Sequence, residues 1–396
     1  MAPRLRSANA LHNVLPEEAL RVLFLALPVD ARARAACVCR AWRAFLADPT
    51  LWQVLDLTPD GGVAAERVTE NLVRGAVARA AGGMRELSSG RYDSNLLVRF
   101  IESDGAELQQ VSTDDKLRPD QLAAIFAAAP RLQTLNADVG GHCTDLLPFL
   151  RNGLLRVSDM LVHVMRPDED EATVHAFAAA VAAHKSLKRL RMFGRYATRG
   201  INALFDAAAE CRIPDVMMVG TFLNTESVPA LARLLLRGSL TELAVRCDNF
   251  PDADEASVLA LCDALRACRT LTRLELQLNP PQGANRRVVA ELLDAAASLP
   301  VLSTLSLYNS RFQDVVEAGR AFGALLRANQ PSLRVLDVQD CSLGDDGVAP
   351  ILDGLAANTH LWYLSCGVLN GLSEEFERDR LQPALAELEA RRELDA

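Results

Sequence analysis

The spacing of apolar residues changes about fifty residues into the chain. Before that point it is helical, with four apolar residues at i, i+3, i+4 and i+7. This first set consists of Leu20, Leu23, Phe24 and Leu27. Pro16 suits the first position of the helix that the set predicts, and Pro28 ends that helix. A second helix is expected around residues 31–36, and a third carries Val38, Trp42 and Phe45.

From Trp52 onward a different pattern returns: one apolar residue, two others, a second apolar residue, one other, and a third apolar residue. Its starts from Met84 on lie 24 to 31 residues apart. The clear copies begin at Leu187, Ile213, Leu240, Leu271, Leu302, Leu333 and Leu361. Each copy ends in a stretch of period two, which predicts a short strand, and helical segments lie between the copies. A fixed period of this length is typical of a solenoid.

The physics of such an array predicts the fold class. One strand–helix unit cannot bury its apolar face alone, but stacked neighbours can. Right-handed crossovers place parallel strands on one side and helices on the other. Because helices are wider than strands, the stack curves. We therefore expect an α/β fold in which three N-terminal helices precede a curved solenoid with concave strands and convex helices.

Composition narrows the function classes. The formal net charge is −9, which argues against nucleic acid as a partner, because its binders concentrate positive charge. The nine cysteines include no CxxC spacing, so we interpret them as reduced thiols. No apolar stretch approaches the ~20 residues of a membrane span, and residues 1–13 lack a signal-peptide core. These features favour a cytoplasmic or nuclear protein without a membrane partner.

The N-terminal segment resembles the F-box, the motif that docks on the Skp-family adaptor of cullin-type ubiquitin ligases. The resemblance rests on Leu15-Pro16, the first apolar set, Val38-Cys39-Arg40 with Trp42-Arg43, and Pro49-Thr50-Leu51-Trp52. The segment departs from the family in its alanine-rich middle helix. The resemblance implies a Skp-family adaptor and a cullin ligase core as partners. It also implies that the adaptor-binding residues are Leu15, Pro16, Leu20, Leu23, Phe24, Leu27, Val38 and Trp42.

The repeats resemble leucine-rich repeats of the longer, ribonuclease-inhibitor type. The best unit runs over residues 333–359, with Cys341 at the small polar turn and Gly344 and Gly347 leading into a helix. We therefore expect a disordered N-terminus at 1–10, the F-box at 11–57, the repeats at 58–372 and a helical cap at 373–396.

Strand residues that alternate with the buried ones should face the concave side. The candidates for binding a target protein there are Arg189, Arg191, Phe193, Met217, Arg246, Arg273, Glu275 and Tyr308. Arginine and aromatic residues dominate interface energetics. The alternative is a solvated sheet with no partner. Residues 185–199 are basic and could receive an acidic or phosphorylated segment, or could simply balance the acidic residues 168–171.

Catalytic and metal chemistry find little support. The adjacent His142 and Cys143 lack a recognisable orienting third group, so a structural pair is favoured. The Cys37-Val38-Cys39 segment lacks metal-ligand spacing. We expect no catalytic residue, no metal and no cofactor.

Three functions remain open. The first is a non-catalytic substrate-recognition subunit of a Skp–cullin–F-box ligase, whose repeats bind a target protein. The second is a repeat scaffold or inhibitor without a ligase role. The third is an enzyme or a GTPase activator, which would need an exposed arginine such as Arg189, Arg191 or Arg246.

Overall fold

The structure is a computed structural model that describes residues 15–63, 67–90, 94–164, 171–194, 198–220, 222–237, 239–246, 249–252, 255–277, 287–312 and 314–395. The expected disordered N-terminus at 1–10 lies outside these residues. The chain forms two compact units. The first comprises the residues up to 141 with 145–160, and the second comprises 142–144 with the residues from 161 onward. None of the described helices is long and apolar enough to span a membrane.

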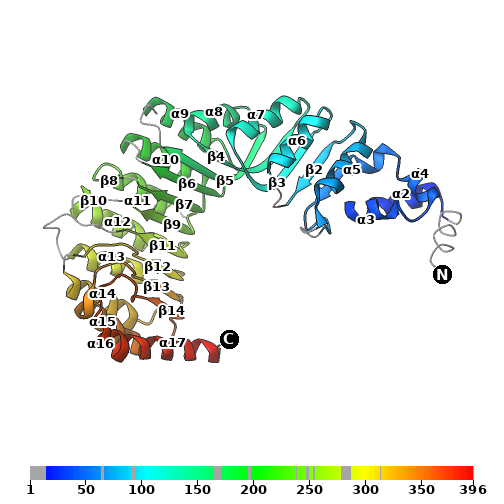
Figure 1. Ribbon diagram of the computed structural model, residues 1–396. Coiled ribbons are helices and arrows are strands. Elements are labelled where there is room, and N and C mark those ends of the chain that lie inside the picture. The colour runs from blue at the N-terminus through cyan, green and yellow to red at the C-terminus, as the bar shows by residue number, and fades with distance from the viewer. Residues whose placement is uncertain are drawn as a thin grey trace. The chain divides into compact units, whose positions relative to one another are not determined.

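Three short helices and a 3-10 turn open the first unit (Figure 1). They are α2 (Glu17–Leu25), α3 (Val29–Ala35), α4 (Arg40–Phe45) and η1 (Pro49–Trp52). Phe24 and Trp52 are fully buried between them, and the Trp52 indole donates a 2.8 Å hydrogen bond to the Leu46 carbonyl. Helix α4 begins at Arg40, so Val38 precedes it rather than forming part of it.

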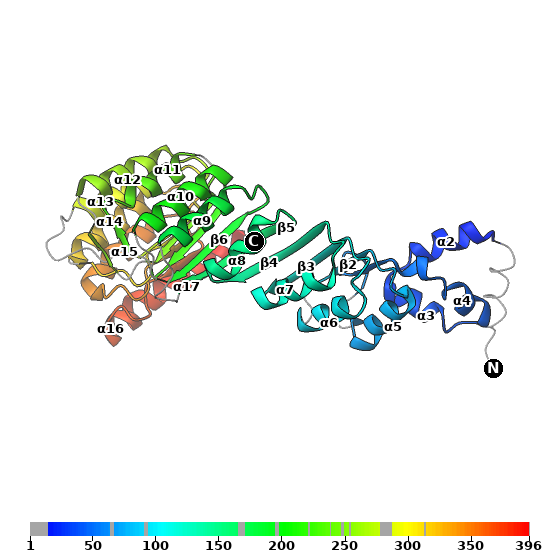
Figure 2. The same cartoon turned by 90° about the horizontal axis from the view of Figure 1, so that it is seen from above.

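Parallel strands follow, each paired with the next along the chain. The strands of the first unit are β1 (Val54–Leu57), β2 (Glu86–Ser89), β3 (Gln110–Leu117) and β4 (Thr134–Gly141), and β5 (Leu155–Val164) begins in it. Its further helices are α5 (Glu70–Ala80), α6 (Ser94–Asp104), α7 (Pro119–Ala128) and α8 (Cys143–Arg151). Helices α5, α6 and α7 lie side by side (Figure 2). The row Leu55, Leu87, Val111 and Leu135 is buried, as the repeat pattern predicts.

The second unit repeats this strand–helix alternation with a more regular period. Its main strands are β6 (Arg189–Gly194), β7 (Asp215–Val219), β9 (Glu242–Arg246), β11 (Arg273–Leu276), β12 (Thr304–Ser306), β13 (Val335–Asp337) and β14 (Tyr363–Ser365). Strands β8 (Phe222–Asn224) and β10 (Asn249–Asp252) pair separately. The helices are α9 (Glu171–Ala182), α10 (Thr198–Cys211), α11 (Val228–Leu236), α12 (Glu255–Ala267), α13 (Arg287–Ala297), α14 (Val315–Arg327) and α15 (Gly344–Ala356).

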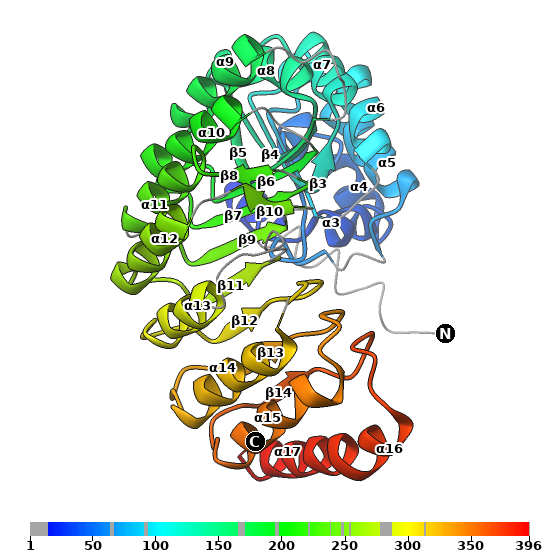
Figure 3. The same ribbon diagram turned by 90° about the vertical axis from the view of Figure 1, so that its left-hand side faces the viewer.

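In this unit the main strands line the inside of a curve and the helices cover its outside (Figure 3). The α/β fold class, with N-terminal helices followed by parallel strands and helices, is thereby confirmed. Helices α16 (Glu374–Phe376) and α17 (Gln382–Asp395) close the last repeat, since Leu381 and Leu388 are buried beside it.

Helices α14 and α15 approach each other unusually closely. A Cβ atom placed on Gly323 would overlap the backbone of Pro350, and one on Gly347 would lie 2.9 Å from the Val315 carbonyl oxygen. Only glycine allows two helix backbones to come this near without moving one of them. The repeat at 333–359 is therefore tightly packed against the repeat before it.

Candidate functional site

The outer surface of α2 is the first candidate interaction surface. Val22 is 69% exposed, Leu25 46% and Leu23 39%, and Val38 beyond the helix is 39% exposed. Pro16 is also exposed, whereas Leu15, Leu27 and Trp42 are half-buried. Since α2 buries only one side, its other side presents apolar residues to solvent.

The eight residues predicted for adaptor binding thus divide by their surroundings. Leu20 and Phe24 are buried, and Phe24 packs edge-on against Trp42 with ring centroids 5.2 Å apart. They support the helix from inside. Sequence reasoning missed Val22 and Leu25, because it followed the stripe at i, i+3, i+4 and i+7 and ignored the opposite side. The signal was present in the sequence: apart from Glu17, Glu18 and Arg21, every residue of α2 is apolar.

Buried polar groups fix α2 in place. Arg32 is buried, and its guanidinium donates hydrogen bonds to the carbonyls of Leu27 (3.0 Å) and Leu51. Burial lowers the pKa of Arg32, although a guanidinium stays protonated at neutral pH. Arg32 therefore ties the end of α2 to η1.

A second brace runs from the middle of α2. Arg21 donates to Thr50 Oγ1 at 2.6 Å and pairs with Asp48. Hydrogen bonds from Thr50, together with the charge of Arg21, lower the pKa of Asp48. The exposed apolar residues thus project from a helix that is held at two points.

The strand face of the second unit is the second candidate. Arg189 and Arg273 are exposed, Tyr308 is just exposed, and Arg191, Phe193, Met217 and Arg246 are half-buried. Glu275 is buried instead, and it pairs with Arg246 and with Arg273 at 3.7 Å. Asp215 pairs with Arg189 at 3.4 Å. These carboxylates neutralise much of the positive charge that the sequence suggested for this face.

The predicted basic stretch at 185–199 is only partly described, since Arg195 lies outside the described residues. Lys185, Lys188 and Arg199 are exposed, and Arg199 approaches Glu171 to 3.8 Å. The other acidic residues of 168–171 also lie outside the described part. The charge of this stretch is therefore shared with at least one carboxylate.

The contacts of His142 and Cys143 are those of residues with a structural role. His142 Nδ1 lies 2.6 Å from the carbonyl oxygen of His163, whose ring stacks on Phe193 at 5.5 Å. Cys143 is fully buried at the start of α8.

Two other buried cysteines have raised pKa values. Burial raises the pKa of Cys262 to about 11 and that of Cys366 to about 12, so both thiols are protonated at neutral pH. Protonated thiols are poor nucleophiles and poor metal ligands.

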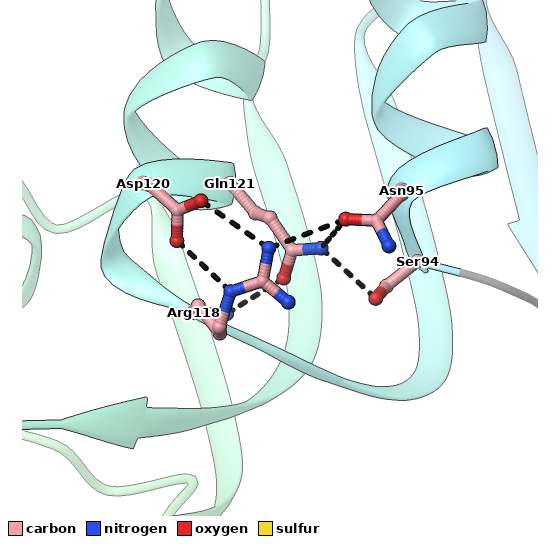
Figure 4. A network of polar contacts seen from close by, with 5 residues as sticks. All are labelled: Ser94, Asn95, Arg118, Asp120 and Gln121. Atoms are coloured by element: carbon pink, nitrogen blue, oxygen red, sulfur yellow. Dashed lines mark hydrogen bonds and ion pairs between the residues drawn. The ribbon is translucent and has the colours of Figure 1, made fainter.

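A polar network joins the N-terminal ends of α6 and α7 (Figure 4). Gln121 is buried, and its amide donates to Ser94 Oγ at 2.9 Å and to Asn95 Oδ1 at 3.0 Å. Arg118 donates its backbone N–H to Gln121 and its guanidinium to Asp120 and Asn95. Because each member is engaged within the network, we assign it to the joining of two repeats.

A pocket of about 470 Å³ lies between α5 and α6. Arg74, Val77, Phe100 and Asp104 contribute to its walls. Arg74 is engaged by Glu70, and burial raises the pKa of Asp104. The pocket lies among helices, away from the strand face of its unit.

Sequence reasoning also missed a group of exposed apolar residues in the last repeat. Trp362 immediately precedes β14 and Tyr363 begins it, and Val368 and Leu369 lie in the loop after it. The strand alternation in the sequence predicts Tyr363 on the concave face, but the other three were not singled out. The corresponding loops of the two preceding repeats carry Asn309 and Asp340, which also have positive φ, where this loop carries Leu369. That replacement of polar by apolar residues was the available signal.

Comparisons with known proteins confirm the two resemblances. Residues 12–58 match the F-box-like family, and residues 329–352 match a leucine-rich repeat family. The chain is similar to the putative F-box/LRR-repeat protein 23 of Arabidopsis thaliana, with 24% identity over 223 residues that cover 52% of this chain and 47% of the relative. It thus spans about half the length of that curated relative.

Among solved structures, the chain is similar to one from the crystal structure of the Rad7 and Elc1 complex in yeast. The identity is 15%, the TM-score is 0.39, and the match covers 84% of this chain and 91% of that chain. A likeness at this score carries no weight for function.

Proposed function

We propose that this chain, which carries an F-box-like domain ahead of leucine-rich repeats, is a substrate-recognition subunit of a Skp–cullin–F-box ubiquitin ligase. The observation that carries the proposal is the apolar side of α2. Val22, Leu23 and Leu25 are exposed on a helix that is braced from within by buried side chains. An exposed apolar patch of this kind marks a site of protein–protein contact.

In the proposed mechanism this chain catalyses no reaction. The α2 surface holds the Skp-family adaptor and through it the cullin core, while the repeats hold a target protein. Tethering raises the effective concentration of the target's lysines beside the ubiquitin-loaded enzyme. The chain then acts as a non-catalytic receptor, and its specificity comes from the surface of the repeats.

We infer the contact residues for each partner from the exposure of their side chains. On the adaptor side, Val22, Leu23, Leu25, Pro16 and Val38 present exposed surface, and Leu20 and Phe24 support them from the core. On the target side, Arg189, Arg273 and Tyr308 are exposed on the strand face. The ion pairs of the two arginines must be shared or exchanged when a partner binds.

The test is binding of a purified Skp-family adaptor to the full chain. Val22→Asp with Leu25→Asp places two charges on the exposed side of α2 without touching its core. We expect the affinity to fall at least a hundredfold, because isolated charges would be desolvated in an apolar contact. Leu236→Asp, an equally exposed leucine on α11, is the matched control and should leave binding unchanged.

Unchanged adaptor binding by the double variant, or no binding by the parent chain, would remove the ligase assignment. The repeats would then favour the scaffold function, in which the N-terminal helices only cover the first repeat. Thermal unfolding of each variant, followed by circular dichroism, shows that the fold is retained.

A further inference from the structure

The loop after β14 presents two aliphatic side chains to solvent. Val368 is 58% exposed and Leu369 is 67% exposed, the largest exposed fraction of a leucine in the described part of the chain. The backbone of Leu369 has φ = 55°, in the left-handed region. A residue with a side chain as large as leucine is disfavoured in that region. The fold therefore holds an apolar side chain outward at a cost in backbone energy.

Asn370 fixes this loop to the repeat before it. Its side chain is buried and donates to the carbonyls of Val338 (2.8 Å) and Cys366 (2.6 Å). Its oxygen accepts from the backbone N–H groups of Cys341 (2.9 Å) and Leu343 (3.3 Å). All polar groups of the amide are thus used. The loop is rigid beside its exposed residues, which lowers the entropy cost of binding there.

The surroundings of the loop are acidic. Between Arg334 and Arg378 the sequence contains eight aspartate and glutamate residues and no lysine or arginine. Two hydrogen bonds bring this charge to the loop: Asp340 N–H donates to the Val368 carbonyl (3.0 Å), and Ser373 N–H donates to Asp345 (2.9 Å). Among the residues that the structure describes, Asp340, Asp346, Glu374 and Glu375 form no ion pair.

We propose that Val368, Leu369, Asp340, Asp346, Glu374 and Glu375 form a docking rim for a segment of the target protein that carries an apolar anchor next to lysine or arginine. This inference rests on the proposed function, since it names the class of target that the repeats select. The apolar anchor covers the two exposed aliphatic residues. The basic residues complement carboxylates that form no ion pair within the described part of the chain.

The charge of the rim does not suit an acidic partner. An acidic or phosphorylated segment would be repelled by the rim, and on the strand face it would have to compete with Glu275 and Asp215 for the arginines. A basic apolar segment meets neither obstacle at the rim. It also brings lysines, which are the groups that a ubiquitin ligase modifies.

The test measures fluorescence anisotropy of short synthetic peptides with the full chain, in the absence of any adaptor. One peptide has leucine and phenylalanine flanked by lysines, the second has serines between the lysines, and the third has the apolar pair between glutamates. We expect the first to bind at least about tenfold more tightly than the others, and to weaken as sodium chloride rises.

Two variants locate the binding. Leu369→Ser removes the anchor contact and Glu374→Gln with Glu375→Gln removes charge, and each should weaken the first peptide about tenfold. Leu236→Ser is the matched apolar control. Glu17→Gln with Glu18→Gln is the matched charge control, because this pair also occupies the first turn of a helix. Neither control should change the affinity.

Equal affinity for the three peptides, no binding of the first at millimolar concentration, or unchanged binding by both rim variants would overturn the proposal. Failure here is separable from failure of the ligase assignment. Val22→Asp with Leu25→Asp tests the adaptor alone and should leave peptide binding intact, whereas the rim variants should leave adaptor binding intact.

Discussion

Replacing Asn370 by alanine tests how the last repeat is held together. The change removes four hydrogen bonds and leaves two backbone N–H groups and two carbonyls without their side-chain partner. Each buried polar group left unsatisfied costs about 1–3 kcal/mol. Water can enter the space left by the amide and satisfy part of this set, and the 3.3 Å bond is weak. We expect a loss of about 3–5 kcal/mol.

Urea unfolding followed by circular dichroism measures this loss. In a repeat array the stability is local, so the last repeats should unfold first and the transition should broaden. Hydrogen exchange locates the effect, because the amides of Cys341 and Leu343 lose their acceptor and should exchange faster. Asn152→Ala is the matched control, since that exposed asparagine accepts one hydrogen bond from its own loop.

A change of less than about 0.5 kcal/mol for Asn370→Ala, equal to that of the control, would refute the reasoning. It would mean that the loop keeps its conformation without the amide. Asn370→Asp separates the two halves of the network, since it keeps the acceptor for two N–H groups and loses both donors. Asn370→Asp should destabilise the fold at least as much as Asn370→Ala, because it also buries a charge.

Three further changes test other parts of the structure by urea unfolding. Gly323→Ala should destabilise by about 2 kcal/mol through overlap with Pro350, whereas Gly75→Ala, whose Cβ meets only the end of Arg79, should be neutral or slightly stabilising. Asp48→Asn should lower stability at neutral pH. Because the folded pKa of Asp48 is lowered, the difference should vanish as the pH falls below that pKa. Asp104→Asn should do the opposite: its folded pKa is raised, so the ionised carboxyl costs stability above its unfolded pKa, and the gain from asparagine should disappear in acid. A reversed sign in either pH series would contradict the assigned cause.

The repeat architecture could be predicted from the sequence because the same spacing of apolar residues recurs in every repeat. The buried row through Leu190, Val216 and Leu243 follows directly from that spacing. The ends of elements were less certain. Val38 was expected on the third helix, but the backbone becomes helical only at Arg40, after the Cys39 side chain accepts from the N–H of Trp42.

The ion pairs of the strand face could not be predicted, because they depend on which side chains meet across neighbouring strands. Glu275 was expected to lie on the concave face and bind a target. It is buried by arginines from two strands, and one of them, Arg246, lies 29 residues away in the sequence. A pattern of alternating residues shows which way a side chain points. It does not show which neighbour neutralises it.

The two interaction surfaces proposed for this chain share one physical device. In each, apolar side chains are exposed beside a buried polar residue whose hydrogen bonds reach distant backbone: Arg32 holds α2, and Asn370 holds the loop after β14. Exposed aliphatic groups on a loose segment would fold back onto the nearest apolar surface. A fixed backbone prevents this collapse and lowers the entropy that a partner must overcome. Asn370 could not be recognised from the sequence, because three of its four partners lie in the preceding repeat.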